Sequence, residues 1–116
     1  VHIIHGSQTG LNTTTFPSQR WTQTPQRGEG VEAGDQFGYT LSSWNFGGSA
    51  TADLAVGVPF EDVGSVVDAG MVHVIYSGAP GVGLSGPAGH QVWTQASPGL
   101  PSRPLRRTNM FGFTAY

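Results

Sequence analysis

Two runs of residues decide the fold: DQFGYTLSSWNFGGSATADLAVGVP (residues 35–59) and AGMVHVIYSG (residues 69–78). They contain three short stretches of apolar and β-branched residues, at 37–44, 53–59 and 71–76. Turn-forming Gly, Pro, Asn and Asp residues bound each stretch, a pattern that is typical of β-strands. Three such strands in succession predict a β-meander.

The composition favours a small domain built from strands. The chain has 116 residues, of which 18 are Gly and 8 are Pro, as expected for short strands joined by tight turns. A net charge of −2 and the lack of lysine argue against a nucleic-acid or membrane-surface partner. The lack of cysteine excludes disulfides and thiolate metal sites. Because the first residues already resemble a strand, we expect processing or a fragment of a longer protein.

An internal repeat runs through the chain. VHII (1–4) returns as VHVI (72–75), WTQ (21–23) as WTQ (93–95), FGYT (37–40) as FGFT (111–114), and Leu11 as Leu84. The four matches keep their order, at offsets of about 72 residues, while most other positions differ. We interpret them as a naturally diverged repeat, present as one full unit and parts of two more.

One unit is predicted to contain four strands. No stretch keeps the apolar period of a helix, so the fold class is all-β. Strands are expected at 1–5, 19–24, 37–44, 53–59, 71–76, 91–95 and 110–116, with a loop at 6–18 and a tight turn at 45–52. The chain then divides into the second half of one unit (1–34), a complete unit (35–107) and the first strand of the next (108–116).

The strand at 53–59 should be covered on both faces. Leu54 and Val56 share one face, and Ala55 and Gly57 share the other, so both faces are apolar. Stacked and radially repeated sheets, as in β-propellers, have this property. Since fewer than about three repeats rarely bury enough surface, we expect further units from more chain or from other copies.

Phe37-Gly38, followed about twenty residues later by Gly57-Val58-Pro59, resembles the FG-GAP repeat. DAGMVHVIYSG (68–78) is similar to the third strand of that family. The resemblance covers nearly the whole chain. It implies one and a half four-stranded blades of an FG-GAP-type β-propeller, seven-bladed in the family, like those of integrin α-subunits and bacterial secreted proteins. Together with the repeated tryptophans, the expected blade-packing residues are Trp21, Phe37, Gly38, Gly57, Pro59, Trp93, Phe111 and Gly112.

The resemblance also implies a calcium loop between the first two strands of a blade, matching residues 45–54. The candidate ligands are Asn45, Ser49, Thr51 (through its carbonyl) and Asp53. Calcium takes about six to eight oxygens, several of them from carboxylates, whereas only Asp53 is charged here. The alternative, which we favour, is a metal-free hairpin. In it Asn45 and Ser49 bond the turn backbone and Asp53 caps amides.

The four histidines are interpreted as structural. His2 and His5 lie three residues apart on a strand and point to opposite faces, so they cannot hold one ion together. His2 and His73 occupy equivalent positions of the repeat, and His90 stands alone near the start of a strand. Trp21 and Trp93 recur in register, which favours a packing role over stacking on a sugar.

Two charged clusters are interpreted as solvated loops: Glu61, Asp62 and Asp68, and Arg103, Arg106 and Arg107. The acidic cluster lacks a partner base or nucleophile for acid–base chemistry, although carboxylates can also hold a metal. The basic cluster could grip a phosphate or an acidic partner, but it follows a Pro-rich segment where exposed arginine is ordinary. Asn12-Thr13-Thr14 is a glycosylation sequon.

We therefore expect a non-catalytic, extracellular or cell-surface module that binds a protein or glycan in adhesion. The alternative is a structural subunit whose blades pair between identical chains. A third and weaker reading is a non-catalytic part of a larger secreted enzyme. No nucleic acid and no membrane insertion are expected, and calcium is the one cofactor that the resemblance implies.

Overall fold

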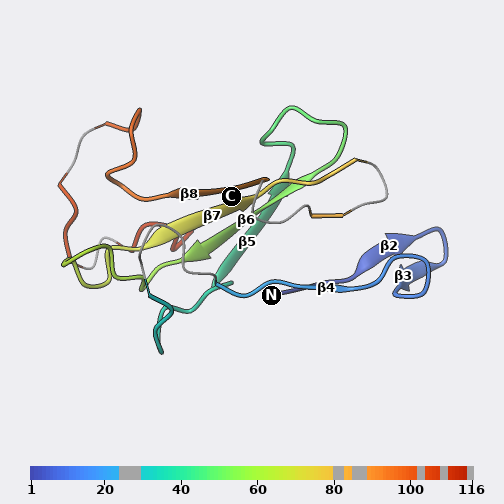
Figure 1. Ribbon diagram of the computed structural model, residues 1–116, viewed down its shortest axis with the longest axis horizontal. Helices are drawn as coiled ribbons and strands as arrows, with labels where there is room; N and C mark the ends of the chain where they lie inside the picture. The colour runs from blue at the N-terminus through green and yellow to red at the C-terminus, as the bar shows by residue number, and fades with distance from the viewer. Residues whose placement is uncertain (24–29, 80–82, 85–88, 102–103, 108–109, 115–116) are drawn as a thin grey trace.

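The computed structural model describes residues 1–23, 30–79, 83–84, 89–101, 104–107 and 110–114 (Figure 1). Every named element in these ranges is a β-strand, which confirms the all-β expectation. The strands are β1 (His2–Ile3), β2 (His5–Ser7), β3 (Gly10–Asn12), β4 (Gln19–Arg20), β5 (Thr40–Trp44), β6 (Asp53–Val58), β7 (Met71–Ile75) and β8 (His90–Trp93). The same residues include no apolar helix of membrane-spanning length.

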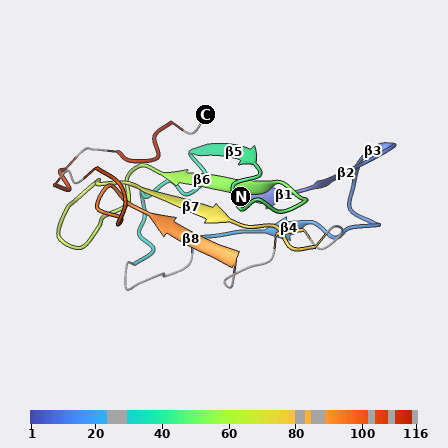
Figure 2. The same ribbon diagram turned by 90° about the horizontal axis from the view of Figure 1, so that it is seen from above.

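The strands β5 to β8 form a four-stranded antiparallel sheet in chain order, as Figure 2 shows. The predicted meander is therefore present. Its first strand begins later than expected, at Thr40 rather than Phe37. The reason is a turn: Gly38 has a φ of 95°, and the amide of Tyr39 donates to the carbonyl of Gln36 (3.0 Å).

The N-terminal residues form two separate two-stranded sheets, β1–β4 and β2–β3. The prediction of one strand over 1–5 and a loop over 6–18 is wrong in two respects, because the strand breaks at Ile4 and residues 5–12 form a hairpin. Ser7 closes that hairpin: its Oγ donates to the carbonyl of Gly10 (2.8 Å) and accepts from the amide of Thr9 (3.2 Å). The polar sequence of the hairpin lacks the apolar alternation that marks a strand.

The strand predicted at 110–116 is also wrong over its described part. Phe111 makes a single parallel bridge to Gly70 and no ladder. Met110 and Gly112 have φ values of 47° and 89°, which interrupt the extended backbone that a strand requires. The amide of Phe113 instead closes a turn on the carbonyl of Met110 (2.9 Å). The strand predicted at 19–24 is too long, because β4 ends at Arg20 and residues 21–23 are not in a strand, and the strand predicted at 91–95 ends at Trp93. Thr24 and residues 115–116 lie outside the described residues.

The register of β1–β4 reproduces that of β7–β8. His2 lies opposite Arg20 and Ile3 opposite Gln19, while Val1 and Trp21 exchange two backbone hydrogen bonds (2.8 and 2.7 Å). The repeat equivalents pair in the same way: His73 with Val92, Val74 with Gln91, and Val72 with Trp93. The internal repeat found in the sequence therefore corresponds to a repeated strand pairing.

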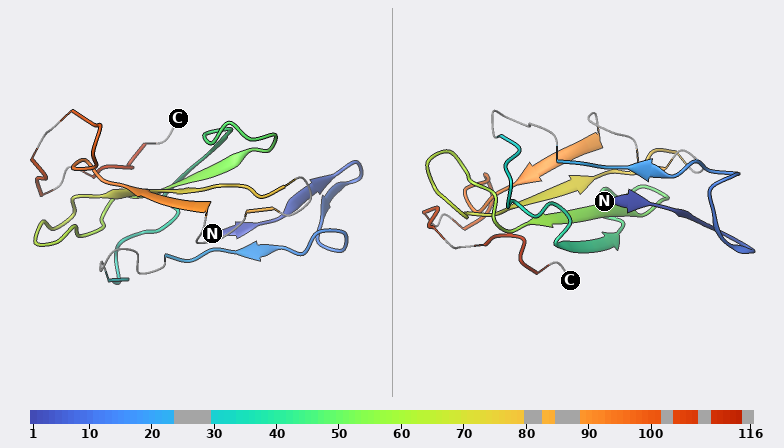
Figure 3. Two further views of the ribbon diagram at one scale, coloured as in Figure 1. Left: turned by 45° about the horizontal axis from the view of Figure 1, so that its top comes forward. Right: turned by 90° about the horizontal axis from the view of Figure 1, so that it is seen from below.

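The four-stranded sheet has two apolar faces. We call the face with Leu54, Val56, His73 and Ile75 the N-face, and the face with Ala55, Gly57, Val72, Val74 and Trp93 the C-face. On the N-face Leu54, Val56, Ile75 and Leu84 form a buried cluster, and the N-terminal strands pack against it through Val1, Ile3 and Trp21. Figure 3 shows β1 and β4 as a second layer beside this sheet.

Candidate functional site

The turn between β5 and β6 carries the four candidate calcium ligands, and Asp53 is its anchor. This side chain is 2% exposed. Its Oδ1 accepts hydrogen bonds from the amide and the hydroxyl of Ser77 (2.9 and 3.0 Å), and its Oδ2 accepts one from the amide of Gly47 (2.8 Å). Asp53 thus joins the β5–β6 turn to the residue two places after the end of β7.

The surroundings of Asp53 favour the charged carboxylate. Burial by itself would raise the pKa of Asp53. The backbone hydrogen bonds from Ser77 and Gly47, with further bonds from the Ser77 hydroxyl and the Phe46 amide, outweigh burial and hold the pKa below its usual value. The carboxylate needs no metal to be satisfied here.

Of the other three candidate ligands, Asn45 and Ser49 bond within the same turn, whereas the Thr51 hydroxyl bonds residues that follow β7. The side-chain amide of Asn45 donates to the carbonyl of Ser49, and the Ser49 hydroxyl donates to the carbonyl of Thr51 (2.9 Å). The Thr51 hydroxyl bonds the Ser77 hydroxyl and the carbonyl of Gly78 (3.1 Å). The contacts of Asn45 and Ser49 are those of a self-bonded hairpin turn.

The donor set does not suit calcium. It offers one carboxylate, and both of its oxygens already accept hydrogen bonds. Among the described residues, no three His, Asp or Glu side chains are grouped so that they could hold a metal ion. The geometry therefore fits the metal-free turn better, while calcium binding itself stays a prediction.

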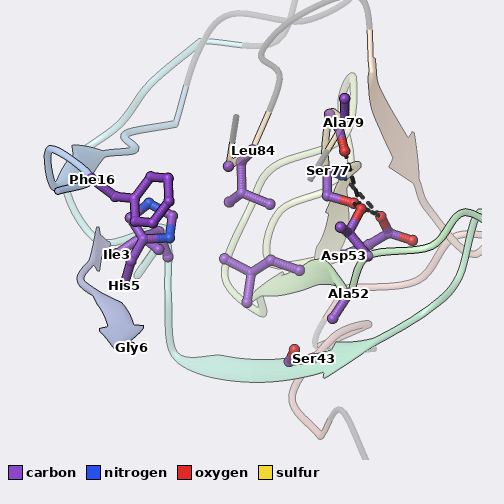
Figure 4. A pocket seen from close by; sticks show the side chains of 14 residues that line it. Ile3, His5, Gly6, Phe16, Ser43, Ala52, Asp53, Ser77, Ala79 and Leu84 are labelled. Atoms are coloured by element: carbon purple, nitrogen blue, oxygen red, sulfur yellow. Dashed lines mark hydrogen bonds between the residues drawn. The ribbon is translucent and has the colours of Figure 1, made fainter. Parts of the chain in front are cut away.

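A cavity of about 440 Å³ lies next to this turn, between the N-terminal strands and the N-face (Figure 4). Ile3, His5 and Phe16 line one side, and Leu54 and Leu84 line the other. Asp53 is at one end, with its hydrogen bonds to Ser77 drawn in Figure 4. Since the polar atoms of Asp53 are already paired, the cavity offers a mainly apolar wall.

The side chain of Gln19 ties the two layers together beside the cavity. Its amide nitrogen donates to the carbonyl of Leu84 (2.9 Å), and its amide oxygen accepts from the amide of Leu84 (2.9 Å). The Gln19 side chain thus bonds the backbone of Leu84 in the way that a neighbouring strand would.

The predicted blade-packing residues fall into two sets. Trp21, Phe37 and Gly38 lie on the N-face side, where an added Cβ at Gly38 would come within 2.7 Å of the side chain of Val1. Their repeat equivalents Trp93, Phe111 and Gly112 lie at the C-face, where an added Cβ at Gly112 would come within 2.9 Å of the side chain of Val72. Because Val1 and Val72 are themselves repeat equivalents, the Phe-Gly contact occurs twice.

Gly57 lies within β6 and allows a close backbone contact, and Pro59 directly follows the strand. A Cβ at Gly57 would meet the carbonyl oxygen of Gly112 at 2.1 Å, so only glycine fits this close approach. The hydroxyl of Thr40 donates to the same carbonyl (2.8 Å). β6 ends at Val58, directly before Pro59, whose nitrogen cannot donate to a strand ladder.

One pair of side chains is missed by sequence reasoning. His73 Nδ1 and His90 Nε2 are 2.7 Å apart, and His73 is 1% exposed. Burial, with the charge of His90, lowers the pKa of His73 to about 4, and burial lowers the pKa of His90. The strand register accounts for the contact, because His90 lies opposite Ile75 on the face that also carries His73. The equivalent His2 is exposed.

Within the acidic cluster, Asp62 and Asp68 line one pocket with Glu32 and Asp35, whereas Glu61 does not line it. Glu61 is buried and accepts a hydrogen bond from the side chain of Gln23. Asp62 accepts from the amide of Asp68 (2.9 Å), which closes the β6–β7 loop on itself. These carboxylates have structural partners, and the arrangement does not bring them together with a base or nucleophile among the described residues.

The remaining candidates lie on the surface. Arg106 and Arg107 are exposed, whereas Arg103 lies outside the described residues. In the sequon, Asn12 Oδ1 accepts from the amides of Thr14 and Thr15 (2.7 and 2.9 Å), which makes a capped turn.

The comparisons with known proteins bear on the family resemblance. No family model matches the chain, and neither a curated protein nor a solved structure shows significant similarity to it. The resemblance to FG-GAP repeats therefore rests on the sequence motifs and stays a prediction.

Proposed function

We propose that this chain is a segment of an FG-GAP-type β-propeller, in which β5–β8 is one blade and β1–β4 is the second half of the blade before it. The observation that carries the proposal is the repeated contact of the Phe-Gly motif. Gly38 sits against Val1, and Gly112 sits against the equivalent Val72. A contact that recurs at the repeat spacing is what stacked units of one architecture produce.

The C-face supports further stacking. An apolar groove of about 290 Å³ runs over it and is lined by Val72, Val74, Trp93 and Phe111, among others. Their repeat equivalents are Val1, Ile3, Trp21 and Phe37, which all pack on the buried cluster of the N-face. The C-face groove thus carries the side chains that in the other copy are covered by a neighbouring sheet. A further unit would bury them in the same way.

In this proposal the chain is a non-catalytic, extracellular binding module for a protein or a glycan. The end of β5 supports such a role, since Trp44 is 71% exposed there. Phe46, in the β5–β6 turn, is 44% exposed but lines the C-face groove, so a further unit would cover it. Exposed aromatic rings bind sugar faces and protein surfaces well because they bring large apolar area at low entropy cost.

Self-assembly is the second candidate, and the open C-face favours it. A second copy could place its own N-face there if its β1–β4 pair were displaced, because both partners have equivalent side chains. The groove leaves Val72, Trp93 and Phe111 half-buried, so a second copy would remove further apolar surface from water there.

Binding to arrays of glycans and extracellular-matrix proteins tests the proposal. We expect the wild-type chain to bind a member of such an array and Trp44→Ala to lose at least about tenfold in affinity. Trp93→Ala is the matched control and should keep binding, because Trp93, on β8, lines the C-face groove that the next unit covers in this proposal. Light scattering on the same samples, with and without a calcium chelator, distinguishes the alternative: a discrete oligomer without array binding would favour self-assembly and contradict the module.

A further inference from the structure

Two imidazole rings meet where the N-terminal strands sit on the N-face. His73, on β7, contacts His90, on β8, through Nδ1 and Nε2 at 2.7 Å. The ring of Phe37 stands edge-on to that of His73, with centroids 5.3 Å apart. Phe37 belongs to the same packed group as Val1, Ile3 and Trp21, so His73 lies within the interface between the two layers.

Only one of the two facing ring nitrogens, His73 Nδ1 or His90 Nε2, can carry a proton while they are hydrogen-bonded to each other. When both imidazoles are neutral, one ring nitrogen donates and the other accepts. A second proton on the facing nitrogens would set two N–H groups of like charge against each other at this distance. The contact is therefore lost only when both facing nitrogens carry a proton, whereas one added proton leaves the bond in place and charges a ring through its other nitrogen.

Among the described residues, the buried surroundings of His73 provide no hydrogen-bond acceptor for a protonated ring. In the part of the chain that the structure describes, His73 Nε2 and Trp21 Nε1 are the buried side-chain polar atoms without a hydrogen-bond partner. Trp21 Nε1 is a donor, so it cannot accept from a protonated His73. A buried charged N–H without an acceptor costs free energy, and the protonated ring would be such a group.

The neighbouring elements bring no carboxylate to the pair. β5 and β6 present Leu41, Ser43, Leu54 and Val56 on this face, none of which titrates. In the N-terminal layer the side chains of His2 and Arg20 are exposed, and the Val1 nitrogen donates to the carbonyl of Trp21 (2.7 Å). The buried carboxylate of Glu61 accepts from Gln23 and is not among the groups that shift the pKa of His73.

We propose that the packing of β1 and β4 on the sheet depends on the protonation of the His73–His90 pair. Acid then releases these strands before the four-stranded sheet opens. Release would expose the N-face to water, which then hydrates the charged rings. The sheet keeps its own backbone ladder of hydrogen bonds in this state. The inference rests on the packing of the two layers and does not depend on the proposed binding role.

The direction follows from proton uptake. The pKa of His73 is lowered from 6.5 to about 4 in the packed state, so between these values the released state binds a proton that the packed state does not. Packing therefore weakens as pH falls below 6.5, and the loss is nearly complete at about 4. Between about pH 7.5 and about pH 4.5 the packing equilibrium should shift on the order of fiftyfold.

Hydrogen exchange measured by mass spectrometry tests this on the 116-residue chain. After correction for the intrinsic pH dependence of exchange, protection of the amides in residues 1–21 should fall by at least about tenfold at about pH 4.5. Protection in β6 and β7 should remain. In His73→Leu the fall should be much smaller, since an apolar side chain takes up no proton and only His90 of the pair can still titrate. His2→Leu is the matched control, because the equivalent His2 is exposed, and it should retain the wild-type response.

Two results would overturn the inference. One is a simultaneous loss of protection in residues 1–21, β6 and β7, which would mean general acid unfolding. The other is an unchanged acid response in His73→Leu. If that variant does not fold, His90→Gln keeps a hydrogen-bonding partner for His73 and removes one titrating ring, and its acid response should be smaller than that of the wild type. An equal response would contradict the role of the pair.

Discussion

The strand pairs β1–β4 and β7–β8 have the same register but different surroundings. Ile75 in β7 is 0% exposed, whereas the equivalent Ile4, just after β1, is 47% exposed. His73 is buried against Phe37 and His90, while its equivalent His2 is exposed. β7 pairs with β6 on one edge and β8 on the other, but β1 has β4 as its strand partner among the described residues. Burial here is set by the number of neighbouring strands and layers, because the local sequence is nearly the same.

The largest expected difference between the two copies is at the isoleucines. Ile75→Ala should lower the free energy of unfolding by about 2–5 kcal/mol, because it opens a cavity in the core cluster. Ile4→Ala should cost less than about 1 kcal/mol, since that side chain is half-exposed. Urea denaturation of both variants measures the two values. Equal losses would mean that β1 is as well covered as β7 and would remove the contrast.

The glycines of the repeated Phe-Gly motif should differ less. Gly112→Ala would place a Cβ 2.5 Å from the carbonyl oxygen of Met71 at a φ of 89°, which we expect to cost about 2–3 kcal/mol. Gly38→Ala, at a φ of 95°, meets the end of the Val1 side chain, which can rotate away, so about 1–2 kcal/mol is expected.

The same urea titrations rank these two variants, and Gly6→Ala is a control because an added Cβ at Gly6 has no atom within 4 Å. A larger loss for Gly38→Ala than for Gly112→Ala would show that the first copy of the contact is the more rigid one.

The smallest expected losses of stability are those at the equivalent glutamines. Gln19→Ala removes both hydrogen bonds to Leu84 and should cost about 1–2 kcal/mol. Gln91→Ala removes an exposed bond from the Tyr76 hydroxyl and should cost less than about 0.5 kcal/mol. Thermal unfolding of both variants makes the comparison. If Gln91→Ala were the more destabilising, the side chain of Gln19 would not be what ties the layers together.

Much of the central sheet could be predicted because its strands are apolar and bounded by turn residues. β6 and β7 agree with the predicted strands to within one residue at each end, and the repeat identified the segments that form β1 and β4 as equivalents of β7 and β8. The hairpin β2–β3 could not be predicted, since side-chain and turn contacts of Ser7 hold it rather than an apolar pattern. The positive φ values at Met110 and Gly112, which break the expected last strand, leave no mark in a hydrophobicity pattern.

The sequence by itself determined the all-β class and the spacing of the repeat, since these depend on residue type and order along the chain. It also favoured Asp53 as a cap for amides, but the two bonds from Ser77 come from 24 positions away. Only the tertiary structure decided which copy is buried and which histidines touch. His73 and His90 are 17 positions apart and meet because antiparallel pairing brings β8 back beside β7. The close approach of Gly112 to Gly57 likewise joins residues far apart in the chain. Strand register and the packing of layers fix such contacts, and both depend on the whole sheet rather than on any one segment.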